Sequence, residues 1–198
     1  MTKIKEIIIG TNNKGKYREI YDLLPNEVKK YSPQEFNILT PEETGESFEE
    51  NSIIKASYFS KKTNLICLSD DSGLEIDLLG GEPGVYSGRW AGRNSNFDLA
   101  IKKIYEKMGS IKKDWKNYNT ARFICCLTLF WPDGNNYSST GIVEGKISDT
   151  KKGKNGFGYD PIFIPNKEKQ TFGEMTNKQK ISVDHRFKAF SKIKNFFI

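Results

Sequence analysis

Two neighbouring carboxylates, Asp70 and Asp71, follow the apolar residues 65–68 and are the first candidates for catalysis. The apolar run predicts a short strand, and the pair then lies at its carboxyl end, where α/β proteins usually bind ligands. Adjacent carboxylates repel each other unless a cation or hydrogen bonds offset their charge. Glu42 and Glu43 offer further oxygen ligands from a separate acidic segment. Carboxylates and substrate phosphates together suffice for Mg²⁺, so the set indicates a magnesium site, with a solvated turn as the alternative.

A second candidate is the loop of residues 10–16, between an expected strand at residues 3–9 and an expected helix. Its G-x-x-x-x-G-K spacing is that of a P-loop, but Tyr17 stands where a P-loop has the Ser or Thr that ligates magnesium. A P-loop-like NTPase therefore stays open as an alternative, as does a plain surface turn. Backbone N–H groups at a helix N-terminus, with a lysine nearby, suit phosphate oxygens. The candidate ligands are Thr11, Asn12, Asn13, Lys14, Gly15 and Lys16.

A third candidate is the glycine-rich segment 156–161. Phe157 or Tyr159 could stack on a base, and Asp160 could accept a hydrogen bond from a ring N–H. The glycines, Gly158 among them, permit a close approach of the backbone. An ordinary loop with packed aromatic side chains is the alternative.

Lys180, His185 and Arg186 are further hydrogen-bond donors near the start of the last expected helix. His185 is the single histidine of the chain, which excludes a metal site with several histidines. The chain has three cysteines and no C-x-x-C pair, so we expect buried thiols in a reducing compartment.

An α/β framework is needed to position these residues, and the hydrophobic pattern predicts one. Helices are expected from Tyr17 to a stop at Pro25, from a Ser47 capping box through residue 59, over residues 97–108 with a stop at Gly109, and around residues 187–193. Residues 121–131 and 137–147 are expected to form a hairpin around Pro132-Asp133-Gly134. Helix-separated strands and a hairpin predict an α/β fold with a mixed sheet. No repeat or linker divides the chain, so one domain over residues 1–198 is expected.

The composition narrows the class of partner. The net charge of +6 can signal nucleic acid, but the lysines are dispersed, so a basic nucleic-acid-binding module is only an alternative and no stable nucleic-acid partner is expected. The longest apolar runs fall far below the ~18 residues that a membrane span needs. No hydrophobic leader is recognisable at the N-terminus, and we expect a cytoplasmic protein.

Taken together, these segments resemble the inosine triphosphate pyrophosphatase family, in the same order and spacing from about residue 7 to residue 189. The stretches that carry the resemblance are Thr11-Asn12-Asn13-Lys14-Gly15-Lys16, Glu42-Glu43-Thr44-Gly45 with Phe48, Glu50-Asn51 and Lys55-Ala56, Ser69 to Leu74 running through Gly80-Gly81 to Ser87 and Arg89, Ala121-Arg122-Phe123, Gly156 to Phe163, and Glu174-Met175 to Arg186. Any one motif is modest, whereas the ordered set is highly specific. Two departures are Asp184, where the family usually has Ser, and Gly173, where it has Ala; residues 94–119 match poorly.

The resemblance implies a two-lobed α/β fold with a long mixed central sheet and a nucleotide cleft between the lobes. It also implies a homodimer, a Mg²⁺ cofactor and a purine nucleoside triphosphate substrate. The implied activity is hydrolysis of ITP, dITP and XTP to the monophosphate and pyrophosphate, which removes deaminated purines from the nucleotide pool.

The resemblance also implies a role for each site residue. Asp71 is implied as the catalytic carboxylate and a metal ligand, with Glu42 as the other ligand and Glu43 as its competitor. The implied substrate-binding residues are Thr11, Asn13 and Lys16 on the phosphates, Lys55 and Ser72 as further contacts, and Phe157, Gly158, Tyr159, Asp160, Lys180, His185 and Arg186 around the base and sugar phosphate.

Overall fold

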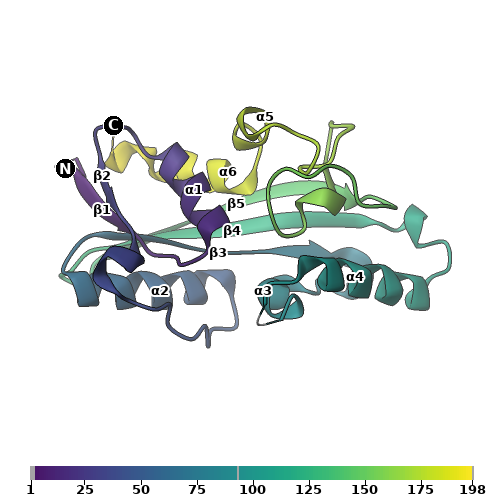
Figure 1. Ribbon diagram of the computed structural model, residues 1–198, viewed down its shortest axis with the longest axis horizontal. Coiled ribbons are helices and arrows are strands. Elements are labelled where there is room, and N and C mark those ends of the chain that lie inside the picture. Colours follow the sequence, from purple (N-terminus) through teal and green to yellow (C-terminus); the bar gives the residue numbers. More distant parts are fainter. Residues whose placement is uncertain (1–2, 93, 198) are drawn as a thin grey trace. The chain divides into compact units, whose positions relative to one another are not determined.

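The computed structural model describes residues 3–92 and 94–197 and confirms the predicted α/β class with a mixed sheet (Figure 1). The six strands follow the order β2-β1-β3-β4-β5-β6 in the sheet. β1 pairs in parallel with β2 and β3, whereas β5 pairs antiparallel with β6. The strands are β1 (Glu6–Ile9), β2 (Lys29–Tyr31), β3 (Cys67–Ile76), β4 (Thr120–Phe130), β5 (Asn136–Ile147) and β6 (Phe163–Pro165). The α-helices are α1 (Lys14–Leu23), α2 (Phe48–Thr63), α3 (Ser87–Trp90), α4 (Phe97–Ile111), α5 (Asn177–Ile181) and α6 (His185–Ile193).

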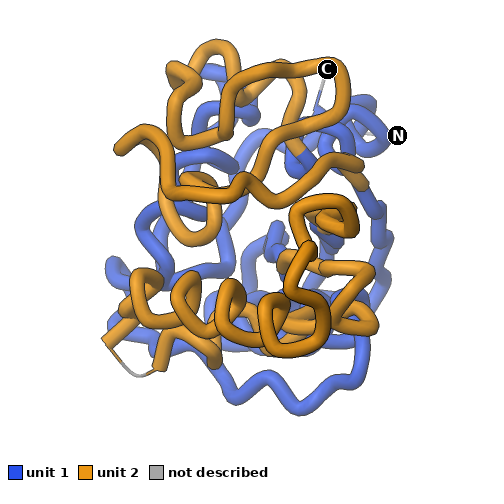
Figure 2. The backbone as a smooth tube through the Cα atoms, turned by 90° about the vertical axis from the view of Figure 1, so that its right-hand side faces the viewer, with its two compact units in different colours: residues 1–71, 125–141, 185–198 blue, residues 72–124, 142–184 orange. Residues whose placement is uncertain are grey.

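The chain divides into two compact units, drawn in different colours in Figure 2. Unit 1 comprises residues 1–71, 125–141 and 185–198, and unit 2 comprises residues 72–124 and 142–184. The sequence predicted one domain over residues 1–198, and each unit has a hydrophobic cluster of its own.

Unit 1 has helices on both faces of its strands, with α1 and α6 on one face and α2 on the other (Figure 1). Ile9 and Leu68 point toward the first face and share a cluster with Ile20 of α1 and Phe190 of α6. Ile8, the residue before Ile9 in β1, points the other way and packs with Phe59 and Ala56 of α2. This alternation is the ordinary period of a strand, and it decides which helix each later residue of β3 meets.

Unit 2 has a separate core in which aromatic side chains pack against α4. Phe123, Phe163 and Phe172 lie with ring centroids 4.8–5.9 Å apart, and they share a cluster with Ile104 and Met108 of α4. Among the described residues, no helix has the length and hydrophobicity to cross a membrane.

The prediction that the two aspartates end a short strand is wrong. β3 begins at Cys67 and continues to Ile76, so both carboxylates lie within it. The strand continues because Leu74 and Ile76 supply buried apolar residues in alternation after the polar stretch. The register of β1 with β3 ends at Ile9 opposite Leu68, so the aspartates still follow the carboxyl end of β1.

Helix boundaries differ from the prediction in smaller ways. The Ser47 hydroxyl accepts from the Glu50 N–H, as predicted for the start of α2, but the Glu50 carboxylate accepts from the Glu46 N–H instead of completing a capping box with Ser47. α4 passes Gly109 and ends at Ile111, because Gly109 occupies an ordinary helical turn. α5 was not predicted, although the Thr176 capping box with Gln179 was a usable signal.

The end of β1 generates a prediction about packing. A Cβ added at Gly10 would stand 2.6 Å from Cys67 Sγ and 2.8 Å from Phe59 Cδ2. Gly10→Ala should therefore lower the free energy of unfolding by about 1–3 kcal/mol, measured by urea denaturation. Gly88→Ala in α3 is the matched control, because nothing lies within 4 Å of its added Cβ. Equal stabilities of the two variants would contradict this account.

Candidate active site

The loop after β1 is a helix N-terminus organised by its own side chains. Thr11 Oγ1 accepts from the Asn13 N–H at 3.2 Å, and Asn13 Oδ1 accepts from the Lys16 N–H at 3.1 Å as the N-cap of α1. Asn12 Nδ2 donates to the Ile38 carbonyl at 3.2 Å. The structure thus places the predicted phosphate segment where helix N–H groups and a first-turn lysine meet, an arrangement that suits phosphate. Lys14 is exposed and Gly15 half-buried.

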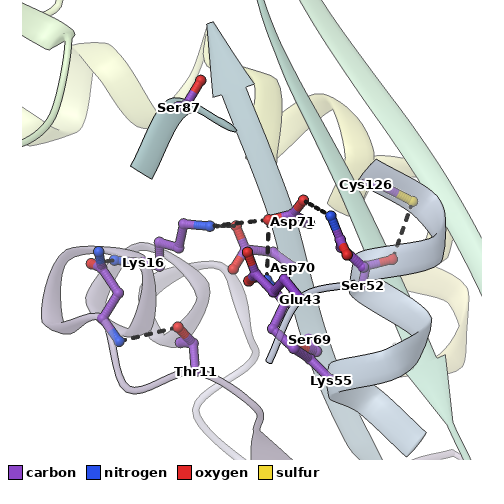
Figure 3. Close-up of polar contacts among 12 residues, drawn as sticks. Thr11, Lys16, Glu43, Ser52, Lys55, Ser69, Asp70, Asp71, Ser87 and Cys126 are labelled. Atoms are coloured by element: carbon purple, nitrogen blue, oxygen red, sulfur yellow. Dashed lines mark hydrogen bonds and ion pairs between the residues drawn. The ribbon is translucent and has the colours of Figure 1, made fainter. Parts of the chain in front are cut away.

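The two adjacent aspartates point to opposite faces of the sheet, and each is met by the helices of that face. Asp71 Oδ1 accepts from Lys55 Nζ of α2 at 3.1 Å, and Lys55 also pairs with Glu43 (Figure 3). Lys16 Nζ of α1 lies 3.3 Å from Asp70 Oδ2 and 3.9 Å from Asp71 Oδ1. The result is a chain of alternating charges, Glu43–Lys55–Asp71–Lys16–Asp70.

The structure distinguishes the two glutamates that the sequence left as competitors. Glu43 is half-buried and pairs with Lys55, which brings its carboxylate to the ammonium that Asp71 also contacts. Glu42 is exposed. Of the two glutamates, Glu43 is therefore the one that shares an ammonium partner with Asp71.

Burial and neighbouring charge act on these groups in opposite directions. Burial raises the pKa of the Asp71 carboxyl, opposed by Lys55 and Lys16 and reinforced by the negative charges of Glu43 and Asp70. Burial alone would lower the pKa of Lys55, but the carboxylates of Asp71, Glu43 and Asp70 outweigh it and raise that pKa. Lys55 therefore stays an ammonium, and added positive charge near Asp71 would favour its ionised form.

Arg186 lies on the Asp70 side of this network. Its Nη2 and Nε atoms donate to Asp70 Oδ2 at 3.1 and 3.3 Å, and Nη1 pairs with Glu19 of α1. Together with the pair of Lys16 and Asp70, these contacts form a second run of alternating charge, Glu19–Arg186–Asp70–Lys16. Sequence reasoning missed Glu19, although its spacing from Lys16 on a predicted helix was visible.

His185 is buried at the start of α6, with Nε2 3.3 Å from Arg186 Nη1. Neither residue is more than 3% exposed. The contacts of Arg186 give it a definite partner in Asp70.

In unit 2 the glycine-rich segment and α5 form a second polar centre. Asp160 Oδ2 accepts from Lys180 Nζ at 2.6 Å and from the Phe157 N–H at 2.8 Å, and all but a few per cent of Asp160 and Lys180 is buried. Tyr159 is also buried, with its hydroxyl donating to the Ser87 carbonyl at 2.9 Å. Phe157 is half-buried, so of the two predicted stacking residues it is the one with accessible ring surface.

Gly156 and Gly158 both have positive φ, 72° and 65°, and a Cβ at Gly156 would stand 2.0 Å from Asp160 Oδ2. The left-handed backbone conformation at these two positions favours glycine, because other residues are strained there. Ser72 is half-buried in β3 where unit 2 begins.

The acidic residues of unit 1 fit a magnesium ion. Among residues 3–92 and 94–197 no group of three or more His, Cys, Asp or Glu side chains gathers as a metal site. Magnesium, however, is commonly held by one or two carboxylates plus substrate phosphates. Asp71 and Glu43, brought together on Lys55, are such a pair beside a phosphate-binding helix terminus.

Comparisons with known proteins agree on one family. A sequence model described as the Ham1 family matches residues 7–196. A curated protein of Bacillus licheniformis named dITP/XTP pyrophosphatase is 42% identical, with 96% of each chain covered, and the protein of that name in Bacillus subtilis is 40% identical, with 98% of this chain and 97% of the other covered. The solved structure of a HAM1 protein from Coxiella burnetii superimposes with a TM-score of 0.86 at 35% identity, covering 97% of this chain and 98% of the other. The Staphylococcus aureus Ham1 protein gives 0.83 at 37% identity, covering 97% of each.

The Arg186 ion pairs generate a prediction about stability. Arg186→Ala leaves the Asp70 carboxylate buried without its guanidinium and should lower the free energy of unfolding by about 3–5 kcal/mol, measured by urea denaturation. Arg18→Ala is the matched control, because Arg18 is exposed on the same helix as Glu19. That control should change stability by no more than about 0.5 kcal/mol. If Arg186→Ala were as stable as Arg18→Ala, the ion pair of Arg186 with Asp70 would not support the fold.

Proposed function

The chain belongs to the Ham1 family, and from this premise we propose that it hydrolyses deaminated purine nucleoside triphosphates to the monophosphate and pyrophosphate. The relatives named dITP/XTP pyrophosphatase, aligned over nearly the whole chain, support dITP and XTP as substrates. The observation that carries the proposal is the buried Asp71 carboxylate, held between Lys55 and Lys16 beside the N-terminus of α1.

In this proposal the triphosphate binds at the loop of residues 11–16. The α1 N-terminus offers backbone N–H groups to phosphate oxygens, with Thr11 and Asn13 as neighbouring polar groups. Lys16 Nζ contributes a positive charge that in the free protein faces Asp70 and Asp71. Its side chain is 17% exposed, so it can reach a ligand without leaving the buried network entirely.

Asp71 orients the attacking water and accepts its proton. The water oxygen forms a bond to the α-phosphorus as the bond to the bridging oxygen breaks, and pyrophosphate leaves. A carboxylate that also holds a metal is a weak base, so orientation of the water is the larger part of its role. The ammonium groups of Lys16 and Lys55 offset the negative charge of the carboxylates and phosphates, which would otherwise repel the nucleophile.

Asp71 and Glu43 would hold magnesium together with the phosphates. When bound, the ion supplies Lewis-acid polarisation of the phosphoryl oxygens and neutralises charge on the leaving pyrophosphate. The charge balance of the site supports this role, because a triphosphate adds several negative charges to a network that already contains buried carboxylates.

The proposal also covers the residues that bind the base, the assembly state of the protein and its location. We keep the prediction that Phe157, Gly158, Tyr159, Asp160, Lys180, His185 and Arg186 serve the base and sugar phosphate. Of the aromatic pair, the half-buried Phe157 is the better stacking surface. A homodimer remains an expectation from the family resemblance, and a cytoplasmic location remains an expectation from the hydropathy of the sequence.

Product analysis tests the reaction. With dITP or XTP and magnesium, the protein should release one pyrophosphate per monophosphate, and orthophosphate should appear only after inorganic pyrophosphatase is added. EDTA should abolish turnover and excess magnesium should restore it. Direct release of orthophosphate would reject the proposal and favour a P-loop-like NTPase.

The glutamate pair tests the metal assignment. Glu43→Gln should raise the magnesium concentration for half-maximal rate by about 10-fold or more, because it removes a carboxylate from the Asp71 side of the site. Glu42→Gln, an equal change at the exposed neighbour, should leave the magnesium requirement essentially unchanged. The reverse result would show that Glu42 is the ligand.

A further inference from the structure

Asn51 is a fully buried amide on α2 that contacts the catalytic carboxylate. Its Nδ2 donates to Asp71 Oδ2 at 3.3 Å. Sequence analysis assigned no role to Asn51 beyond its place in a matching stretch.

Each oxygen of the Asp71 carboxylate has its own donor on α2. Lys55 Nζ donates to Oδ1 at 3.1 Å, and Asn51 Nδ2 donates to Oδ2. Residues one turn apart lie on the same face of a helix, so α2 presents both donors side by side. Two donors on two oxygens fix the plane of the carboxylate, whereas one alone would let it rotate.

The other end of the Asn51 amide holds the acidic segment. Asn51 Oδ1 accepts from the Gly45 N–H at 2.8 Å. A Cβ at Gly45 would stand 2.8 Å from Asn51 Oδ1 and 2.6 Å from Glu50 Cβ, so the backbone approaches this closely only at a glycine. Gly45 is two residues beyond Glu43, so one side chain joins the segment that carries Glu43 to the carboxylate of Asp71.

We propose that Asn51 is a positioning residue for the hydrolytic reaction, which sets the orientation of the Asp71 carboxylate and ties the Glu43 segment to it. An amide suits both ends, because the backbone N–H needs an acceptor and the carboxylate needs a donor. Aspartate keeps the acceptor but loses the donor, and leucine loses both. This inference rests on the proposed function, since it assigns Asn51 a part in that reaction.

The roles of the Asn51 donor and the Asn51 acceptor are distinguished by comparing Asn51→Asp with Asn51→Leu in dITP hydrolysis. Asn51→Asp retains the acceptor for Gly45, so kcat should fall by about 10–100-fold, while the affinity for a non-hydrolysable α,β-imido analogue falls much less. Asn51→Leu also releases the Glu43 segment, so kcat should fall and KM should rise together. A kcat for Asn51→Asp within about threefold of wild type would overturn the role at Asp71.

Asn119→Asp is the matched control, because it makes the same atomic change at an amide whose Nδ2 donates to the Ile147 carbonyl at 2.7 Å. It should lower the melting temperature without lowering kcat. If both aspartate variants lost kcat only in proportion to lost stability, the role of Asn51 would be structural and the proposal would fail.

Gly45→Ala provides a test that leaves Asn51 intact if the Asn51 variants do not fold. Its added Cβ displaces the Asn51 amide from the Gly45 side, so kcat for dITP should fall. A kcat equal to that of wild type would overturn the proposed link between Gly45 and Asp71.

A wild-type protein that releases no pyrophosphate from dITP would reject the proposed function itself. Turnover by wild type and Asn51→Asp at equal rates would reject only the role of Asn51.

Discussion

The burial of two adjacent carboxylates in one strand is the constraint on which the rest of unit 1 depends. Asp70 is fully buried and Asp71 is 4% exposed. Both lie in β3, just beyond the point where its pairing with β1 ends. Ionised groups removed from water are tolerated only when they are paired and hydrogen-bonded. Because neighbouring strand residues face opposite ways, no single partner can fully serve both. Helices are therefore needed on both faces of the strand, each with its own cation.

The two faces use their cations differently. On the α2 side, Lys55 and Asn51 contact Asp71, and both donors are fixed on one helix. On the other side, Arg186 of α6 holds Asp70, while Lys16 of α1 reaches toward both carboxylates. Arg186 is bound on two sides by carboxylates, whereas Lys16 is the more exposed cation and lies in the first turn of a helix. The α2 side therefore holds Asp71 with two fixed donors, whereas Lys16 is the partly exposed cation that the proposed function assigns to a phosphate.

In such a site, the charge of a bound substrate would change the balance between the lysines and the carboxylates of the protein. In the proposed reaction, a triphosphate at the α1 N-terminus would compete with Asp70 and Asp71 for Lys16, and its binding would favour an added cation beside Asp71. This competition would be the electrostatic reason for a divalent ion in a site whose own carboxylates already have lysine partners. Unit 2 has a comparable buried pair, Asp160 with Lys180, which fixes the backbone of the glycine-rich segment.

Much of this protein was determined by its sequence, because the informative residues carry their chemistry locally. The α/β class, the helix N-terminus after β1, the Ser47 start of α2 and the family could all be predicted, since each depends on short-range pattern or on ordered motifs. Only the tertiary structure placed the aspartates inside a strand, paired Glu43 with Lys55, and gave Arg186 its partners. The contacts of Asn51 and Glu19 likewise join segments far apart in the chain. Such contacts depend on which face of β3 each helix covers, and no local pattern of residues specifies that.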